Sequence, residues 1–313
     1  MSNSAGVSSW WSSPPVAAAI EISAERVAGL VCGSGRSVQA HAIEPLPAGA
    51  IVPSLTAPNV VQHDVVSHAV ARVLEALGTP KRVALVVPDV VARLSVVRLD
   101  HVPARIEERD QLIRFNVRKA APFPLDAAVV SITDGQVLDG GGREFVVAVA
   151  RRDVIEEYEA LCAAAHAAAG LVDVAACGAI NLALARGAAE GDWMLVHVGS
   201  DASTIAIVRR GAAIFFRAMP PDSEAALADA IYQSAMYHVD RLGGQGLDRV
   251  VVADRAGRQD VLGSVHHAFE GRTGLRIEPV SLDGAVAFAD RIAVAPDLVA
   301  ALASSAGTLL AQA

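Results

Sequence analysis

The hydrophobic pattern near the start of the chain predicts three short strands separated by tight turns. Apolar or alternating runs lie at 18–23, 27–32 and 37–45, and small or charged residues interrupt them. A comparable run of three strands is predicted over 193–219. Two similar meanders about half a chain apart indicate a duplicated fold with two related lobes.

Each meander is followed by a helical pattern and then by a buried strand. The helices are predicted at 64–77 and 223–242, and the strands at 82–88 and 248–254. Glycine and proline mark the turns between them. The order β-β-β-α-β is therefore predicted twice.

The middle of the chain has a different order of elements. A strand, a helix at 104–120, two strands around the glycines at 140–142 and a helix at 153–169 predict a small α+β subdomain inserted into the first lobe. We expect four parts: a flexible tail at 1–15, a first lobe at 16–89 with a return segment at 171–190, the inserted subdomain at 90–170, and a second lobe at 191–313.

Composition excludes several classes of protein. The chain has 313 residues, of which 53% are apolar and 19% charged, so it can form a large core and is not intrinsically disordered. A net charge of −8 argues against nucleic acid as a partner. No apolar stretch reaches the ~20 residues of a spanning helix, and the first residues do not resemble a signal peptide. We therefore expect a cytoplasmic protein without direct membrane insertion.

The segment 99–132 resembles the inserted subdomain of the type IV pilus assembly protein PilM family. The matching residues are Ile113, Arg114, Phe115, Lys119, Pro122, Phe123, Pro124, Leu125 and Asp126. Weaker likeness extends over 169–186, 193–211 and 230–254. The resemblance implies an α/β fold of the actin-like, ribonuclease-H-like type, related to the division protein FtsA.

The same resemblance implies a cleft between the lobes in which two turns hold the phosphates of a nucleotide. The positions that it assigns to this cleft are Glu21, Ser23, Arg26, His197, Gly199 and Ser203, with 253–256 in place of the adenosine-side glycines. Glu21 stands where the family has Asp, Ser23 where it has Gly, and His197 where it has the metal-holding Asp.

Two added carboxylates make a nucleotide unfavourable in this cleft. Glu25 and Asp201 lie on the two turns, and like charges in contact cost ~1–4 kcal/mol per pair. We therefore expect no cofactor, no catalytic residue and a degenerate cleft, with weak Mg·ATP binding as the open alternative. The competing functions are an active actin-like ATPase or sugar-kinase relative, and a component like the cytoplasmic domain of the type II secretion protein GspL.

The resemblance also implies a protein partner. It predicts a scaffold of the inner-membrane alignment complex that binds the N-terminal tail of a PilN-like bitopic membrane protein, between the first lobe and the inserted subdomain. This scaffold would connect that tail to a pilus motor ATPase. The candidate contact residues are Arg114, Arg118, Lys119, Phe123 and Leu125, whereas Phe115 is expected in the core.

A pair of adjacent histidines is the remaining candidate for a metal site. His266 and His267 share a predicted helix with Asp260 and Glu270. Adjacent side chains point to different faces of a helix. We therefore expect a solvated surface and no metal.

Overall fold

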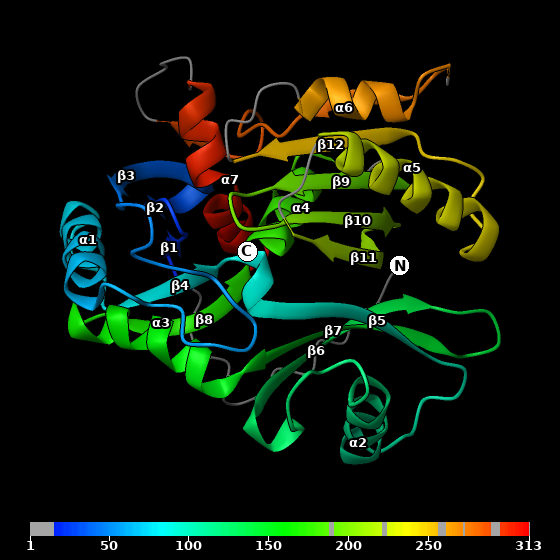
Figure 1. The fold of residues 1–313 in the computed structure, drawn as a ribbon, viewed down its shortest axis with the longest axis horizontal. Coiled ribbons are helices and arrows are strands. Elements are labelled where there is room, and N and C mark those ends of the chain that lie inside the picture. Colours follow the sequence, from blue (N-terminus) through cyan, green and yellow to red (C-terminus); the bar gives the residue numbers. More distant parts are fainter. Residues whose placement is uncertain are drawn as a thin grey trace.

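The computed structural model describes residues 16–187, 191–220, 224–255, 261–271, 273–288 and 295–312. The tail predicted at 1–15 lies outside these residues. Three sheets and seven α-helices form the described part of the chain. Two of the sheets, with their helices, form a first and a second lobe, and the third sheet lies below them in Figure 1.

The first lobe is built on a six-stranded mixed sheet. Its elements are β1 (Ala18–Ile22), β2 (Arg26–Cys32), β3 (Ser37–Pro45), α1 (His63–Ala76), β4 (Arg82–Val87), α3 (Arg152–Ala164), β8 (Ala168–Val174) and β14 (Ala287–Phe288). The strand order is β14-β3-β2-β1-β4-β8, with β1 antiparallel to β2 and parallel to β4. Helices α1 and α3 cover one face, where their apolar side chains pack against the sheet.

The second lobe repeats this arrangement on a five-stranded sheet. Its elements are β9 (Trp193–Val198), β10 (Ser203–Arg209), β11 (Ala212–Met219), α5 (Glu224–Arg241), β12 (Arg249–Asp254), α6 (Val261–Ala268) and β13 (Arg276–Pro279). The strand order is β11-β10-β9-β12-β13, with β9 antiparallel to β10 and parallel to β12. Helices α5 and α6 lie on the outer face.

The third sheet is small and entirely antiparallel. It consists of β5 (Ala92–Leu99), β6 (Ala128–Val137) and β7 (Arg143–Arg151) in the order β5-β7-β6, with helix α2 (Ile106–Val117). Ile113 and Val117 of α2 pack on one face of the sheet, against side chains that include Phe145 and Val147. We call this sheet with α2 the small unit.

Two helices, α4 (Ala175–Ala185) and α7 (Pro296–Leu310), lie between the two large sheets. They cross very closely, because a Cβ atom at Gly307 would lie 1.8 Å from the carbonyl oxygen of Gly178. Only glycine permits this approach. The core around the helices takes side chains from both sheets, so the lobes share one apolar centre.

The predicted fold class is confirmed. Each lobe contains a three-strand meander, a helix and a further strand. The small unit follows β4, the further strand of the first lobe. The residue boundaries of the four parts stay a prediction. The segment 287–310, which that division assigns to the second lobe, supplies β14 and α7, and these pack on the first sheet.

Two local predictions were wrong. The helix predicted at 153–169 ends at Ala164, because His166 has a positive φ of 61° and the residues from Ala168 onward pair with β4. Phe115 was expected in the core, but its side chain is 68% exposed. It lies two residues from both Ile113 and Val117, which face the sheet, so it projects from the opposite side of α2.

Candidate functional site

The cleft between the lobes is crossed by a buried ion pair. Glu21 lies near the end of β1 and its side chain is 1% exposed, whereas Arg255 follows β12 and is 8% exposed. The guanidinium of Arg255 contacts the carboxylate of Glu21. Burial raises the pKa of Glu21, and the positive charge of Arg255 opposes that shift. The pair joins the first lobe to the second at the position where the family resemblance implies a nucleotide and where the sequence predicts a degenerate cleft.

Arg26 also reaches across the cleft. Its Nη2 donates a hydrogen bond to the carbonyl oxygen of Arg255 at 3.1 Å. Burial and the charge of Arg255 lower the pKa of Arg26. Ser23 lies beside it, and both its backbone N–H and its hydroxyl donate to the carbonyl oxygen of Arg26, at 3.0 and 2.9 Å. The polar groups of Ser23 therefore close their own turn.

A second buried pair joins the lobes next to the first. Asp89 begins the short 3-10 helix η2 (Asp89–Val91) after β4, and its Oδ2 lies 2.7 Å from Nδ1 of His197 on β9. The backbone N–H of Ala176 donates to Oδ1 of Asp89 at 2.8 Å. Burial alone would raise the pKa of Asp89, but His197 and this N–H stabilise the carboxylate and hold the pKa below its usual value.

The other predicted cleft residues belong to the turn between β9 and β10. The N–H of Gly199 donates to the carbonyl oxygen of Ala202 at 2.8 Å, and Ser203 is buried at the start of β10. Asp201 is half-buried on the same turn, and burial together with the charge of Asp89 raises its pKa. The structure thus brings the two predicted turns to opposite sides of one cleft.

A separate groove lies between the first lobe and the small unit. It contains a cavity of about 240 Å³. Its walls are formed by Val87, Ala92, Val129, Ser131, Ala148, Ala150, Arg152, Ile155, Glu156, Glu159, Val172, Asp173 and Val174. The floor comes from two cross-strand pairs of the small sheet, and α3 and β8 form the facing wall. The groove is apolar at its base and acidic along α3.

Strand edges flank this groove. β6 is the last strand of the small sheet and β8 the last strand of the first sheet, so each has one side without a neighbouring strand among the described residues. Each edge also exposes an aliphatic side chain, Val129 on β6 and Leu171 on β8, both 38% exposed. Unpaired strand edges are the usual place for an extended peptide to add to a sheet.

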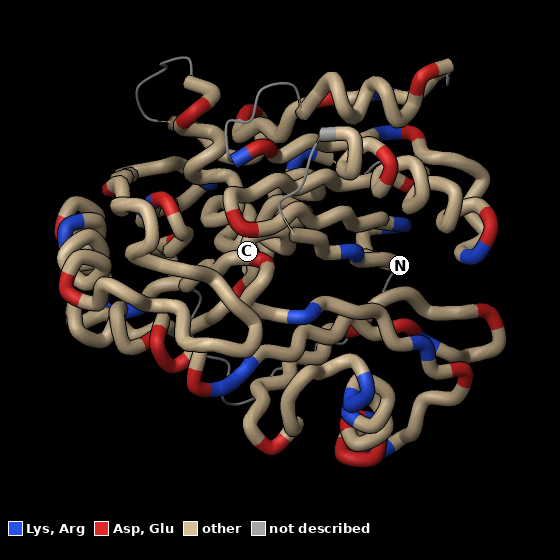
Figure 2. The backbone as a smooth tube through the Cα atoms, viewed as in Figure 1, with Lys and Arg blue, Asp and Glu red and all other residues tan. Residues whose placement is uncertain are grey.

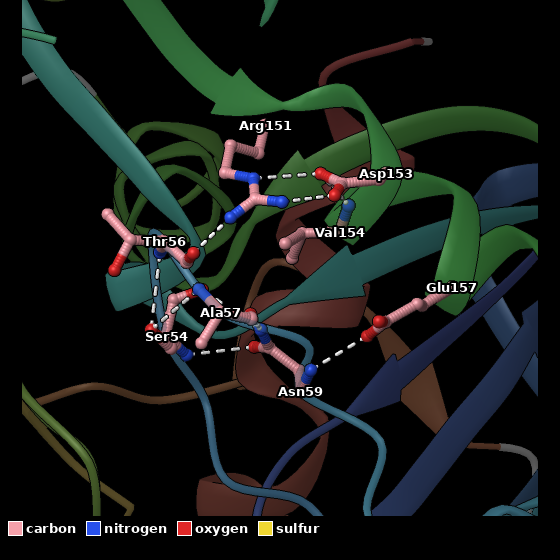
Figure 3. Close-up of polar contacts among 8 residues, drawn as sticks. All are labelled: Ser54, Thr56, Ala57, Asn59, Arg151, Asp153, Val154 and Glu157. Atoms are coloured by element: carbon pink, nitrogen blue, oxygen red, sulfur yellow. Dashed lines mark hydrogen bonds and ion pairs between the residues drawn. The ribbon is translucent and has the colours of Figure 1, made fainter. Parts of the chain in front are cut away.

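The wall that α3 provides is anchored by the loop at 52–60, as Figure 3 shows. Oε2 of Glu157 accepts a hydrogen bond of 2.7 Å from the backbone N–H of Asn59. Arg151, at the end of β7, donates to the carbonyl oxygen of Thr56 and pairs with Asp153. Glu157 therefore faces the loop, whereas its neighbour Glu156 faces the groove.

The predicted partner-binding residues do not line the groove. Arg114, Arg118 and Lys119 are exposed around the end of α2. Phe123 and Leu125 are partly buried against the core of the small unit. All five belong to the face of the sheet that α2 covers, and the groove lies on the other face.

A further cavity of about 480 Å³ lies between the small unit and the second lobe. Leu94 of β5 and Phe216 of β11 are among its lining residues, with Asp89 and Asp201 at the end nearest the cleft. This cavity therefore lies between the small sheet and the second lobe, whereas the groove lies between the small sheet and the first lobe.

The histidine pair shows no sign of a metal site. His266 and His267 are exposed on α6, and Nδ1 of His267 lies 3.5 Å from Oε2 of Glu270. Asp260 lies outside the described residues. In the ranges that the structure describes, no three potential ligands cluster. None of the helices in these ranges is long and apolar enough to cross a membrane.

Sequence reasoning missed the residues that define both sites. Asp89 lies two residues after the buried parallel strand β4, a position where functional side chains often gather, and that signal was available. Arg255 was recognised only as a replacement for glycine. Glu156 and Glu159 face the groove because of the way α3 packs beside the small sheet. No local sequence pattern predicts that packing.

Comparison with known proteins agrees with this architecture. The family model for type IV pilus assembly protein PilM matches residues 20–221. The structure of a PilM-PilN type IV pilus biogenesis complex aligns with a TM-score of 0.77 at 15% identity, over 96% of this chain and 99% of that one. A Bacteroides thetaiotaomicron protein with an actin-like ATPase fold aligns with a TM-score of 0.53 at 12% identity, over 83% and 89%.

The two structural likenesses establish the actin-like fold, and the family match covers more than half of the chain, including most of the first lobe, the small unit and the first strands of the second lobe. The chain therefore belongs to the type IV pilus assembly protein PilM family.

Proposed function

We propose that this chain is a cytoplasmic scaffold of the type IV pilus inner-membrane alignment complex. It holds the N-terminal tail of a PilN-like bitopic membrane protein and is thereby kept at the inner membrane. The solved complex of a PilM with a PilN supports a partner of this kind. The observation that carries the proposal is the groove between the first lobe and the small unit, flanked by two strand edges. The pilus motor ATPase remains a predicted second partner.

The groove has what an extended tail requires. The edges of β6 and β8 offer backbone N–H and C=O groups to a peptide main chain, which is the basis of binding by strand addition. Alternate side chains of the peptide can then reach the apolar floor, where Ala148 and Ala150 leave space. Glu156 and Glu159 form no ion pair among the described residues, so a peptide can enter beside them without breaking one.

The cleft does not fit Mg·ATP. Its centre is filled by the Glu21–Arg255 ion pair and by Arg26, so the guanidinium that could attract a phosphate is already neutralised. His197, which replaces the metal-holding Asp of the family, is paired with Asp89, and an imidazole is a poorer ligand for magnesium than a carboxylate. Asp201 and Glu25 add negative charge. We therefore derive no chemical step in this cleft and propose that it is degenerate.

The proposal is tested by titrating the full chain with a synthetic peptide of the partner's N-terminal tail, using calorimetry. Replacing Ser131 with tryptophan should fill the groove, because Ser131 is exposed on β6 and lines the cavity. We expect Ser131→Trp to weaken tail binding by roughly tenfold or more, which is about 1.4 kcal/mol. The fold should tolerate the change, since aromatic residues suit exposed strand positions.

Thr133→Trp is the matched control. Thr133 is exposed on the same face of β6 one pleat further on, and it does not line the cavity. This variant should bind the tail as the unchanged chain does. If both tryptophan variants bind the tail equally well, the groove is not the binding site. If the tail does not bind the unchanged chain, the proposed function is refuted.

A further inference from the structure

The groove carries more negative than positive charge. Glu156, Glu159 and Asp173 contribute carboxylates to its walls, and Arg152 contributes one guanidinium. We infer that the groove selects a tail that places a lysine or arginine side chain beside Glu156 and Glu159. This inference rests on the proposed function, because it specifies the chemistry of the tail that the groove binds.

The two glutamates are positioned as a pair on the groove side of α3. Residues at spacings of three and four share one face of a helix, so Arg152, Ile155, Glu156 and Glu159 lie along the same stripe. All four line the cavity. Ile155 is buried beside them, so an apolar base lies next to Glu156, which is exposed, and Glu159, which is partly buried.

Neither glutamate is neutralised within the described residues. Glu156 and Glu159 form no ion pair there, although a guanidinium lies on the same stripe of α3. That guanidinium is engaged elsewhere, since Nη2 of Arg152 donates to the carbonyl oxygen of Ala128 at 3.0 Å. Arg152 therefore holds the start of β6 in place beside α3 and leaves the two carboxylates available to a ligand.

Asp173 lies on β8, on the same wall of the groove as α3. Its Oδ2 accepts a hydrogen bond of 2.9 Å from the hydroxyl of Thr308 on α7, and its Oδ1 accepts one of 2.8 Å from the N–H of Val174. These bonds fix the carboxyl group near the end of β8. Burial raises the pKa of Asp173 and so favours its neutral form, which leaves Glu156 and Glu159 as the main negative charges of the groove.

Basic side chains at the end of α2 lie away from the groove. Figure 2 shows acidic positions along α3 and basic positions at the end of α2. Arg114, Arg118 and Lys119 lie on the face of the small unit away from the groove. A basic tail is thus attracted to the two glutamates of the groove and repelled by the basic end of α2.

The test compares two charge-neutralising double variants of the full chain. Glu156→Gln with Glu159→Gln removes the proposed contact, and Glu107→Gln with Glu108→Gln removes the same charge from exposed positions at the start of α2. The probe is the partner's tail peptide, acetylated at its N-terminus so that its side chains carry the positive charge. Thermal midpoints of both variants confirm that the fold is retained.

We expect the groove variant to bind the peptide roughly three- to tenfold more weakly in low salt, and the α2 variant to bind as the unchanged chain does. Raising the salt concentration should reduce the difference, because screening weakens exposed ion pairs. A peptide whose lysines and arginines are replaced with glutamine should bind both variants and the unchanged chain with the same reduced affinity.

The outcomes separate the inference from the proposed function. If the tail binds the unchanged chain and the groove variant equally well, the charge selection is refuted and the tail-binding function stands. If the tail binds neither protein, the proposed function is refuted and the inference falls with it. A loss of affinity that is equal in the groove and α2 variants would assign the effect to net charge and would also refute the inference.

Discussion

Replacing Arg255 with alanine is expected to lower the free energy of unfolding by about 3–5 kcal/mol, the usual cost of removing one partner of a buried ion pair. Glu21 is 1% exposed, and Arg255 is the one cation that the structure places in salt-bridge contact with it among the described residues. Its carboxylate would remain in the core without that partner, and the lobes would lose a direct connection. Urea denaturation of the two proteins measures the difference.

Two further measurements identify the cause of this loss. The double variant Glu21→Leu, Arg255→Met should recover most of the lost stability, because replacing a whole buried pair with apolar residues is often neutral or stabilising. The deficit of Arg255→Ala should also shrink as the pH falls. Burial already raises the pKa of Glu21, and removing Arg255 raises it further, so folding then takes up a proton and is favoured by acid. A deficit below about 1 kcal/mol would mean that the pair behaves like an exposed one.

Asp89→Ala is expected to cost about 3 kcal/mol or more, since hydrogen bonds to a charged group contribute about 1.5–3 kcal/mol each. The carboxylate accepts hydrogen bonds from the backbone N–H of Ala176 and lies 2.7 Å from Nδ1 of His197. Nε2 of His197 is buried and has no hydrogen-bond partner among the described residues. Without Asp89 the whole ring would be unpaired in the core.

The pH dependence of this second effect has the opposite sign. The pKa of Asp89 is lower in the folded protein than its ordinary value, so its contribution is complete above the unfolded value of ~3.9 and is lost as the pH falls through the folded one. The stability difference between the unchanged chain and Asp89→Ala should therefore be constant near neutral pH and decrease below about pH 4. A difference that grows on acidification would contradict the account of this pair.

The duplicated fold could be predicted from the sequence because its signals are local. Alternating apolar residues and tight turns fix each meander, and these patterns recur about half a chain apart. The end of α3 was less accessible, since the Ala-rich segment around His166 satisfies a helical pattern and only pairing with β4 makes 168–174 a strand. Tertiary pairing decided that boundary.

Some residues of the candidate site could likewise be predicted from local sequence, and others could not. Glu21 and His197 were identified through the family resemblance of the strand ends and turns around them, and the structure places them in one cleft. Their partners Arg255 and Asp89 were not recognised, because each contact joins residues more than 100 positions apart. The basic end of α2 was conspicuous in the sequence, whereas the acidic groove is created only when α3, β6 and β8 come together.

Calorimetric titration of the unchanged chain with Mg·ATP decides whether the cleft or the groove is the binding surface of this chain. If buried ion pairs of the chain itself occupy the cleft and connect the lobes, we expect no saturable heat up to millimolar nucleotide, and the same result for Glu21→Ala. Saturable binding at micromolar Mg·ATP that the Glu21→Ala change abolishes would show instead that the cleft holds a nucleotide.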